Sequence, residues 1–262
     1  MNERDLLVLV DVGNTNTVFG VYRHDQLVES FRLSTDSERT ADEYGALLLP
    51  LLGRLRLDPR AAEAVVISSV VPPLNPTFER LSRRFFDCDP LFVGPGVKTG
   101  MPIRYDNPAE VGADRIVNAL AVREQYGCPA IVVDFGTATT FDVVNAQGEY
   151  VGGIIAPGLL ISAEALFAQA SRLYRVDVKA PPQLVGKTTE GAMQSGIYWG
   201  YVGLVDGILE RLLREISGLE IIVATGGQAE LIASGSRYLR SVDPLLTLTG
   251  LKLLYERNLR RS

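Results

Sequence analysis

The sequence predicts an α/β protein made of two similar halves, and three observations support this prediction. Short apolar segments alternate with longer segments whose apolar residues recur at helical spacing. An apolar strand, a polar turn and a second apolar strand occupy residues 6–22, and the same pattern returns at residues 130–144. In both places a third strand follows, at residues 27–33 and 150–155. Because the whole arrangement recurs, we expect an internal duplication.

The other elements follow from hydrophobic periodicity and from turn-forming residues. Residues 40–57 place Ala41, Tyr44 and Leu48 on one face of a helix. Residues 64–71 are rich in Val and Ile, which indicates a buried strand. Further strands are expected at residues 91–93 and 221–224, and further helices at residues 75–86, 157–172, 191–215, 229–234 and 247–259 and within 108–126.

The two polar turns carry residues that suit a phosphate group and its metal. Glycine lets the chain approach a phosphate closely, and backbone N–H groups and hydroxyls donate to its oxygens. A carboxylate at the end of a buried strand suits a cation such as Mg²⁺, bound directly or through its waters. A constant offset aligns identical residues of the two copies: Val10 with Val133, Asp11 with Asp134, Gly13 with Gly136, Thr17 with Thr140 and Val21 with Val144.

One such turn alone is compatible with an ordinary hairpin. Two facing turns could hold a polyphosphate and its metal between them, which favours phosphoryl transfer. A third element, Gly226-Gly227, follows a predicted strand and precedes a predicted helix. Paired glycines there would allow flat, close contact with a base or a ribose.

In this order, the motifs resemble the superfamily of acetate kinases, sugar kinases and actin, and more closely the type III pantothenate kinases. Gly112-Ala113-Asp114-Arg115 and the segment 152–158 distinguish that family from other members of the superfamily. The resemblance implies two ribonuclease H-like (actin/hexokinase-like) domains with a nucleotide cleft between them. The segments that carry it are residues 11–15, 68–72, 112–115, 134–140, 152–158 and 225–227.

The resemblance also implies an activity, cofactors and site residues. The enzyme would phosphorylate pantothenate to 4′-phosphopantothenate with ATP, the first step of coenzyme A biosynthesis, using Mg²⁺ and a monovalent cation, K⁺ or NH₄⁺. Asp134 would bind the monovalent cation, and Asp11 would bind Mg²⁺. ATP would contact Asp11, Val12, Gly13, Asn14, Thr15, Asn16, Thr17, Val18, Thr137, Gly226 and Gly227, and pantothenate would contact Tyr105, Gly112, Ala113, Asp114, Arg115 and Thr189.

Asp114 would be the catalytic general base. A primary alcohol is a poor nucleophile, and a carboxylate within hydrogen-bond reach can accept its proton. Asp114 lies near a predicted helix start, where the helix dipole favours the ionised form. Arg115 suits the carboxylate of pantothenate, because a guanidinium group pairs with it bidentately. The plainer alternatives are a first-turn helix carboxylate and a surface arginine.

Composition argues against several other classes of protein. The formal net charge is -5 and basic residues are spread along the chain, so no nucleic-acid partner is expected. Cys88 and Cys128 lie outside any CxxC pair, which argues against a zinc site or a disulfide scaffold. The acidic N-terminus does not suit a signal peptide, and no apolar run reaches about 18 residues. We therefore expect a cytoplasmic protein without a membrane partner.

We expect the first half at residues 1–117 and the second at 118–262, with a C-terminal helix, 246–262, that could pack back on the first. Helix 191–215 carries small residues at helical spacing on one side: Ala192, Gly196, Gly200, Gly203 and Gly207. Each glycine inside a helix costs roughly 1 kcal/mol relative to alanine, so another backbone should approach closely there. The resemblance implies a homodimer, but the glycine face is equally compatible with packing inside the second half.

Two other functions stay open at this point. One is a kinase of the same superfamily that acts on a sugar or an acetyl group, against which the segment 112–115 argues. The other is an ATP-binding regulator without catalysis, against which Asp11, Asp114 and Asp134 argue.

Overall fold

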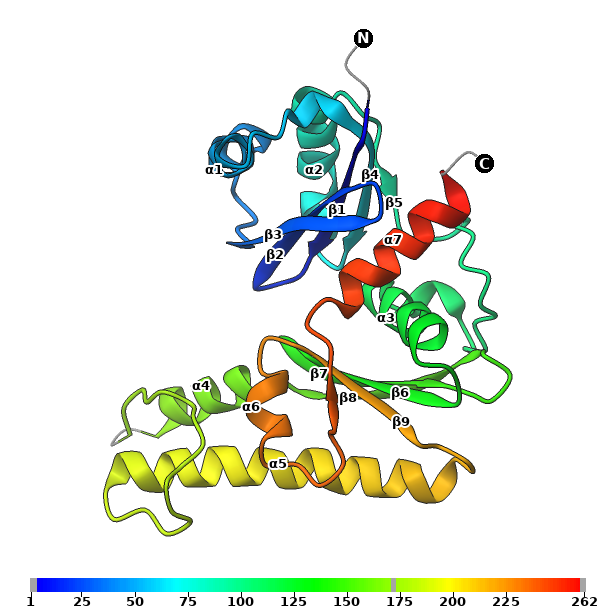
Figure 1. Ribbon diagram of the computed structural model, residues 1–262. Helices are drawn as coiled ribbons and strands as arrows, with labels where there is room; N and C mark the ends of the chain where they lie inside the picture. The colour runs from blue at the N-terminus through cyan, green and yellow to red at the C-terminus, as the bar shows by residue number, and fades with distance from the viewer. Residues whose placement is uncertain (1–3, 171–172, 260–262) are drawn as a thin grey trace. The chain divides into compact units, whose positions relative to one another are not determined.

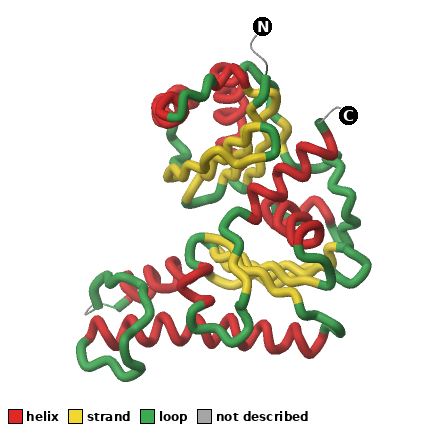
Figure 2. Tube along the Cα trace, in the orientation of Figure 1, coloured by secondary structure: helices red, strands yellow, loops and turns green. Residues whose placement is uncertain are grey.

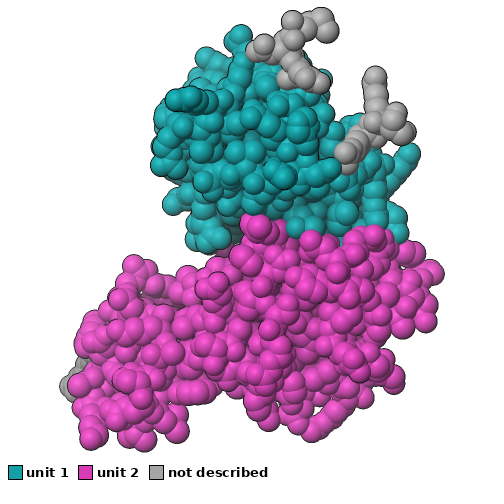
Figure 3. Space-filling model, viewed as in Figure 1, with its two compact units in different colours: residues 1–100, 107–120, 247–262 teal, residues 101–106, 121–246 magenta. Residues whose placement is uncertain are grey.

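The computed structural model describes residues 4–170 and 173–259. The chain forms two compact units, which Figure 3 shows in different colours. Unit 1 consists of residues 1–100, 107–120 and 247–262, and unit 2 of residues 101–106 and 121–246. The last residues of two predicted helices, 171–172 and 260–262, lie outside the described residues.

Each unit contains one five-stranded sheet, and the two sheets have the same topology (Figures 1 and 2). The strands of unit 1 are β1 (Leu6–Val12), β2 (Asn16–Arg23), β3 (Gln26–Ser34), β4 (Ala62–Ser69) and β5 (Leu91–Phe92). Those of unit 2 are β6 (Ala130–Phe135), β7 (Ala138–Val144), β8 (Tyr150–Pro157), β9 (Ile221–Gly226) and β10 (Ser241–Val242). The orders are β3-β2-β1-β4-β5 and β8-β7-β6-β9-β10.

The direction of the strands is also the same in both units. The first three strands of each sheet are antiparallel neighbours, and the fourth and fifth run parallel to the first. The predicted α/β fold with duplicated halves is therefore confirmed.

Helices cover the sheet of unit 1 because its central strand is apolar on both faces. Helices α1 (Ala41–Arg54) and α2 (Asn75–Leu81), the latter continued by a π-helical turn (Ser82–Phe86), bury Tyr44 and Phe78 against one face. A capping box fixes the start of α1, since Thr40 and Glu43 each bind the other's backbone N–H. Short 3₁₀ turns lie at Pro59–Ala61, Pro72–Leu74 and Pro108–Glu110.

The C-terminal helix α7 (Leu246–Asn258) packs on unit 1 beside α3 (Ala113–Gln125). A methyl group on Gly250 would lie 2.6 Å from Cγ1 of Val117, so the two helices touch at a glycine. A methyl group on Gly20 of β2 would lie 2.8 Å from Cδ1 of Leu248. Two glycines thus allow α7 to lie close to both β2 and α3.

In unit 2 the long helix α5 (Thr189–Glu215) lies along one face of the sheet (Figure 1). Its apolar side packs in one core with Ile131 and Val133 of β6, through residues such as Val205 and Leu209. Helices α4 (Leu159–Gln169) and α6 (Ala229–Ala233) complete the unit. None of the described helices has a stretch apolar enough to cross a membrane, although α5 has 27 residues.

The two β-hairpins differ by one residue at the turn. Val12 pairs with Thr17 in the first hairpin, whereas Phe135 at the corresponding place pairs with Thr139 in the second. Thr17 and Thr139 are both 0% exposed. The predicted correspondence of Thr17 with Thr140 is therefore wrong, and so is that of Val21 with Val144. The constant offset holds only as far as the turn.

The hydrogen bonds of the turns show where the residue is missing. In the first turn the N–H of Gly13 donates to the carbonyl oxygen of Asn16, and in the second the N–H of Gly136 donates to that of Ala138, each at 3.0 Å. The second turn closes one residue earlier. Because side chains alternate along a strand, one missing residue exchanges the buried and exposed faces of every following position relative to the predicted alignment.

Candidate active site

The first hairpin places Asp11 at the carboxyl end of a parallel strand pair. Asp11 lies opposite Ser68 of β4, and α/β sheets bind ligands at this edge. The side chains of Asn14, Thr15 and Asn16 are exposed and can reach a ligand. Val12 and Thr17 are 0% exposed, so neither presents its side chain to a ligand.

The buried hydroxyl of Thr17 supports the turn from inside. Its Oγ1 lies 2.9 Å from Oγ1 of Thr35, which donates at 2.7 Å to the carbonyl oxygen of Gly13. Thr35 also donates its backbone N–H to the carbonyl oxygen of Thr15 at 3.0 Å. Thr35 therefore fixes the first turn, a role that turn-forming propensity in the sequence did not indicate.

The second hairpin repeats this arrangement in unit 2. Asp134 lies opposite Thr225 of β9, as Asp11 lies opposite Ser68. Thr137 is exposed at the turn. The backbone of Gly158 packs directly on this turn, because its N–H donates to the carbonyl oxygen of Thr137 at 3.1 Å.

The glycine pair Gly226-Gly227 meets the second hairpin. The N–H of Gly227 donates to the carbonyl oxygen of Phe135 at 3.1 Å. Gly226 has φ +92, and a Cβ on it would lie 2.5 Å from Oδ1 of Asp134. The structure thus brings Asp134, Thr137, Gly226 and Gly227 into one part of unit 2.

Asp114 lies in the first turn of α3, in unit 1. Its Oδ1 accepts the backbone N–H of Arg115 at 2.8 Å. A Cβ on Gly112 would lie 2.6 Å from the same Oδ1, so the glycine leaves room for the carboxylate. Ala113 begins α3, and the carbonyl oxygen of Gly112 accepts the N–H of Ile116 at 3.2 Å.

Burial raises the pKa of Asp114 above its usual value, and the N–H of Arg115 lowers it by a smaller amount. The expectation that the helix start favours the ionised form is therefore outweighed by desolvation. A carboxylate with a raised pKa is a stronger proton acceptor, as a general base requires. Arg115 is only 7% exposed, so it is not an ordinary surface arginine.

Tyr105 and Thr189 are both in unit 2. The half-buried Tyr105 packs on Tyr150, with ring centroids 6.4 Å apart. The hydroxyl of Tyr150 donates at 2.9 Å to the buried carboxylate of Asp142. Thr189 is exposed as the first residue of α5, beside a cavity of about 250 Å³ lined by residues 186–188 and their neighbours.

The predicted site residues are thus divided between the units. Unit 1 holds residues 11–18 and 112–115, and unit 2 holds Tyr105, Asp134, Thr137, Thr189 and the glycine pair. In the described part of the chain, no group of three or more His, Cys, Asp or Glu side chains gathers. Single carboxylates such as Asp11 fit Mg²⁺ that is held mainly by nucleotide phosphates and water.

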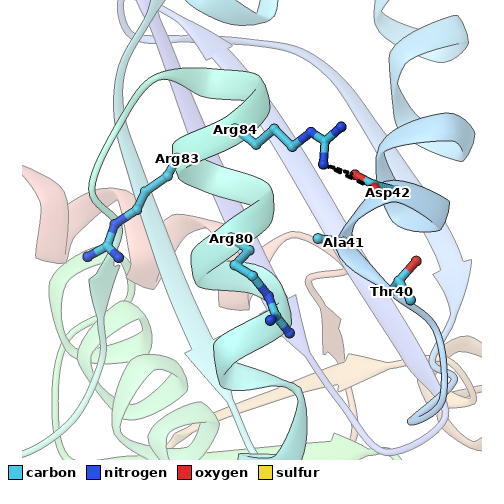
Figure 4. Close-up of a pocket in the computed structure, with 6 residues that line it drawn as sticks. All are labelled: Thr40, Ala41, Asp42, Arg80, Arg83 and Arg84. Carbon is cyan, nitrogen blue, oxygen red and sulfur yellow. Dashed lines mark hydrogen bonds and ion pairs between the residues drawn. The ribbon is translucent and has the colours of Figure 1, made fainter.

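A larger cavity, of about 520 Å³, opens between α1 and the α2 region of unit 1 (Figure 4). It is lined by Thr40, Ala41, Asp42, Arg80, Arg83 and Arg84, none of which is a predicted site residue. Arg84 is paired with Asp42 at 2.9 Å, and Arg83 points away toward its own acidic partners, Glu79 and Asp89. With most of its positive charge neutralised, this cavity is a poor phosphate site.

Comparison with known proteins identifies the family. A family model described as type III pantothenate kinase matches residues 7–211. A type III pantothenate kinase of Koribacter versatilis is 55% identical over 97% of this chain and 96% of its own length. That of Geobacter sulfurreducens is 56% identical over 97% of this chain and 99% of its own length. The chain belongs to the type III pantothenate kinase family.

Solved structures with low sequence identity share the fold of this pantothenate kinase family member. A candidate 2-dehydro-3-deoxygalactonokinase of Sinorhizobium meliloti is 10% identical, with a TM-score of 0.62 over 98% of each chain. A candidate Baf family transcriptional activator of Campylobacter jejuni is 21% identical, with a TM-score of 0.57 over 95% of this chain and 97% of that one. At these identities the likeness concerns the fold alone.

Two residues that support the second turn, Gly158 and Tyr201, were not singled out from the sequence. Gly158 was named only as the last residue of the family segment 152–158. Its close packing against the second turn explains why glycine stands there. The hydroxyl oxygen of Tyr201 on α5 lies 2.6 Å from Oγ1 of Thr139, and these two residues are far apart in the chain. No local sequence signal could have predicted that contact.

Proposed function

We propose that this chain phosphorylates pantothenate with ATP, the first step of coenzyme A biosynthesis. The observation that carries the proposal is the pair of matching hairpins, each with a carboxylate at the end of its first strand, in a member of this family. Phosphoryl transfer needs mainly positioning and neutralisation of charge, and turns of this kind supply both.

In the proposed reaction, the primary hydroxyl oxygen of pantothenate attacks the γ-phosphorus of ATP. The bond from that phosphorus to the bridging oxygen breaks, and ADP leaves with the electron pair. The alcohol proton passes to the carboxylate of Asp114, whose raised pKa suits it to accept a proton. The products are 4′-phosphopantothenate and ADP.

Residues 11–18 and Thr137 would hold the phosphates of ATP, with Gly226 and Gly227 beside its adenosine. The exposed donors of the first turn, Asn14 to Asn16, support this assignment. Mg²⁺ would neutralise the phosphate charge, held in part by Asp11 directly or through water. Asp134 would bind the monovalent cation, K⁺ or NH₄⁺, next to the glycine pair.

For the acceptor, we propose contacts from Tyr105, Thr189 and residues 112–115. The buried guanidinium of Arg115 would pair with the carboxylate of pantothenate, because low exposure strengthens a bidentate ion pair. Gly112 and Ala113 would contribute backbone at the start of α3. Since the reaction consumes ATP for biosynthesis, we place the enzyme in the cytoplasm.

We further propose a homodimer formed through the glycine face of α5. Gly196, Gly200 and Gly203 are exposed, and a Cβ on any of them would meet no described atom within 4 Å. No neighbour in the described chain therefore accounts for glycine at these places. The exposed Trp199 on the same helix and Leu160 and Ile161 of α4 add apolar surface that a second copy would cover.

The test is an assay of ADP release and of phosphorylated product, with pantothenate, sugars and acetate as alternative acceptors. We expect release that depends on pantothenate and that falls when Na⁺ replaces K⁺. Equal rates in the two salts would remove the cation role of Asp134. ATP binding without turnover on any acceptor would instead favour the alternative of a regulator without catalysis. The structural neighbour from Campylobacter jejuni is described as a candidate transcriptional activator.

A further inference from the structure

Tyr201 is a buried residue of α5 to which the proposed mechanism gives no part. Its side chain is 5% exposed. The phenolic oxygen lies 2.6 Å from Oγ1 of Thr139 and 2.9 Å from the carbonyl oxygen of Pro157. A carbonyl can only accept, so the phenol donates its one hydrogen to Pro157 and accepts the hydrogen of Thr139. One side chain therefore joins the start of β7 to the end of β8.

The turn that presents Thr137 joins β6 to β7, and the residue that follows β8 packs against it. Thr139 follows the turn on β7, and Pro157 immediately precedes Gly158. The N–H of Gly158 donates to the carbonyl oxygen of Thr137 at 3.1 Å, and a Cβ on Gly158 would lie 2.6 Å from the carbonyl oxygen of Gly136. The packing leaves no spare room, so a shift of either strand end would displace Thr137.

In the first hairpin, the corresponding buried hydroxyl has a partner that does not come from a helix. There the buried hydroxyl of Thr17 meets Thr35, which follows β3 directly in the chain. Thr139 has the same place in the second hairpin, but its partner is Tyr201, from α5. Because a buried hydroxyl needs a partner, each turn depends on a different element for its position. The second turn depends on α5.

The same helix begins at Thr189, which the proposed function assigns to pantothenate. We propose that Tyr201 is a positioning residue that holds Thr137 for ATP and links the second phosphate turn to the helix that begins at the acceptor residue. This inference rests on the proposed function, both for the ATP contact of Thr137 and for the acceptor contact of Thr189. Burial raises the pKa of Tyr201, so the phenol keeps its proton at neutral pH and remains a donor.

The chain offers a matched control for removing this hydroxyl. Tyr198 lies one turn earlier on α5, is 2% exposed and has its hydroxyl 3.0 Å from Oγ of Ser234, away from the turn. Tyr201→Phe and Tyr198→Phe each remove one buried hydroxyl from the same helix. We expect Tyr201→Phe to weaken ATP binding and raise the KM for ATP about tenfold, the size of one lost hydrogen bond, with the KM for pantothenate within about twofold. Tyr198→Phe is expected to leave both KM values unchanged.

A second variant approaches the same contact from the other side. Thr139→Val removes the hydroxyl that donates to Tyr201, and we expect the double variant with Tyr201→Phe to lose less ATP affinity than the two single losses combined. Equal ATP affinity in Tyr201→Phe and Tyr198→Phe, measured by titration calorimetry, would overturn the inference. The calorimetric comparison tests the role of Tyr201 even if the chain proves to phosphorylate another acceptor. An absence of pantothenate turnover in the native chain would instead contradict the proposed function.

Discussion

The α-carbon of Gly226 faces the carboxylate of Asp134, and a methyl group there would lie 2.5 Å from Oδ1. The two residues come from neighbouring parallel strands, where Asp134 pairs with Thr225 and Phe135 with Gly226. The contact places the glycine pair directly beside the second hairpin. Any residue with a Cβ would have to move this carboxylate and the adjoining backbone of Phe135.

We therefore expect Gly226→Ala to lower kcat/KM for ATP by at least about tenfold and to weaken the response to K⁺. The Cβ would lie 2.5 Å from Oδ1 of Asp134 and 2.6 Å from the carbonyl oxygen of Phe135, so the carboxylate or the strand backbone has to shift, and the φ of +92 would add backbone strain. The measurement is kcat/KM for ATP as a function of K⁺ concentration.

Gly218→Ala is the matched control for that strain. Gly218 has φ +74, also in unit 2, but a Cβ there would meet no described atom within 4 Å. We expect it to cost stability without changing the K⁺ dependence. Equal kinetic effects of the two substitutions would show that strain, and not the contacts with Asp134 and Phe135, explains the loss.

Asp114→Asn is expected to lower kcat by about 10²–10⁴-fold, the usual contribution of a general base, while ATP still binds. The same substitution should leave the free energy of unfolding equal or higher. The raised pKa means that the fold disfavours the ionised carboxylate, and asparagine removes that cost. Denaturant unfolding of both forms at neutral pH checks this, and a less stable variant with near-normal kcat would contradict both assignments.

The pH dependence of the reaction should report the same group. Burial raises the pKa of Asp114, so protonation on acidification begins at a higher pH than for an ordinary aspartate. We expect kcat/KM for pantothenate to fall on the acid side with a single proton, at a pH above the usual value of 3.8. The contribution of this group to folding stability runs the opposite way, because stability decreases as pH rises from the unfolded pKa to the folded one. An acid limb unchanged in Asp114→Asn would assign it to another residue.

Gly200→Leu tests the dimer through α5. A leucine on the glycine face should block close approach of a second helix and yield monomers, seen by sedimentation velocity. Gly53→Leu on α1 is the control, because Gly53 is also exposed and a Cβ there likewise meets no described atom within 4 Å. A Gly200→Leu variant that sediments like the native chain would place the interface elsewhere.

The repeated hairpins could be predicted because their strands are apolar and their turns polar. The extent of the turn was less predictable: Asn16 and Thr17 are turn formers, yet both pair with β3 residues and belong to β2. Tertiary pairing outweighed local propensity there. The two-residue strand β10 was not predicted, since Ser241 and Val242 are too few to show alternation.

The chemistry of the site was harder to predict than its location. Desolvation of Asp114 depends on packing around the start of α3, which no local pattern encodes, so the sequence suggested the opposite direction for its pKa. The supporting contacts of the turns, through Thr35 and Tyr201, join residues that are distant in sequence or lie in another element. The types and order of the motif residues were enough to identify the family. Why glycine stands at a position such as Gly226 became clear only from its contacts in the structure.

The shorter second turn means that the two halves of this chain are no longer interchangeable parts. Grafting the first turn onto the second hairpin would add one residue between Phe135 and Thr139, where the N–H of Gly158 donates to the carbonyl oxygen of Thr137. The longer turn would then have to move the backbone of Gly158 or give up this hydrogen bond. Each turn is thus fitted to the residue that follows the third strand of its own half, Thr35 in one and Gly158 in the other.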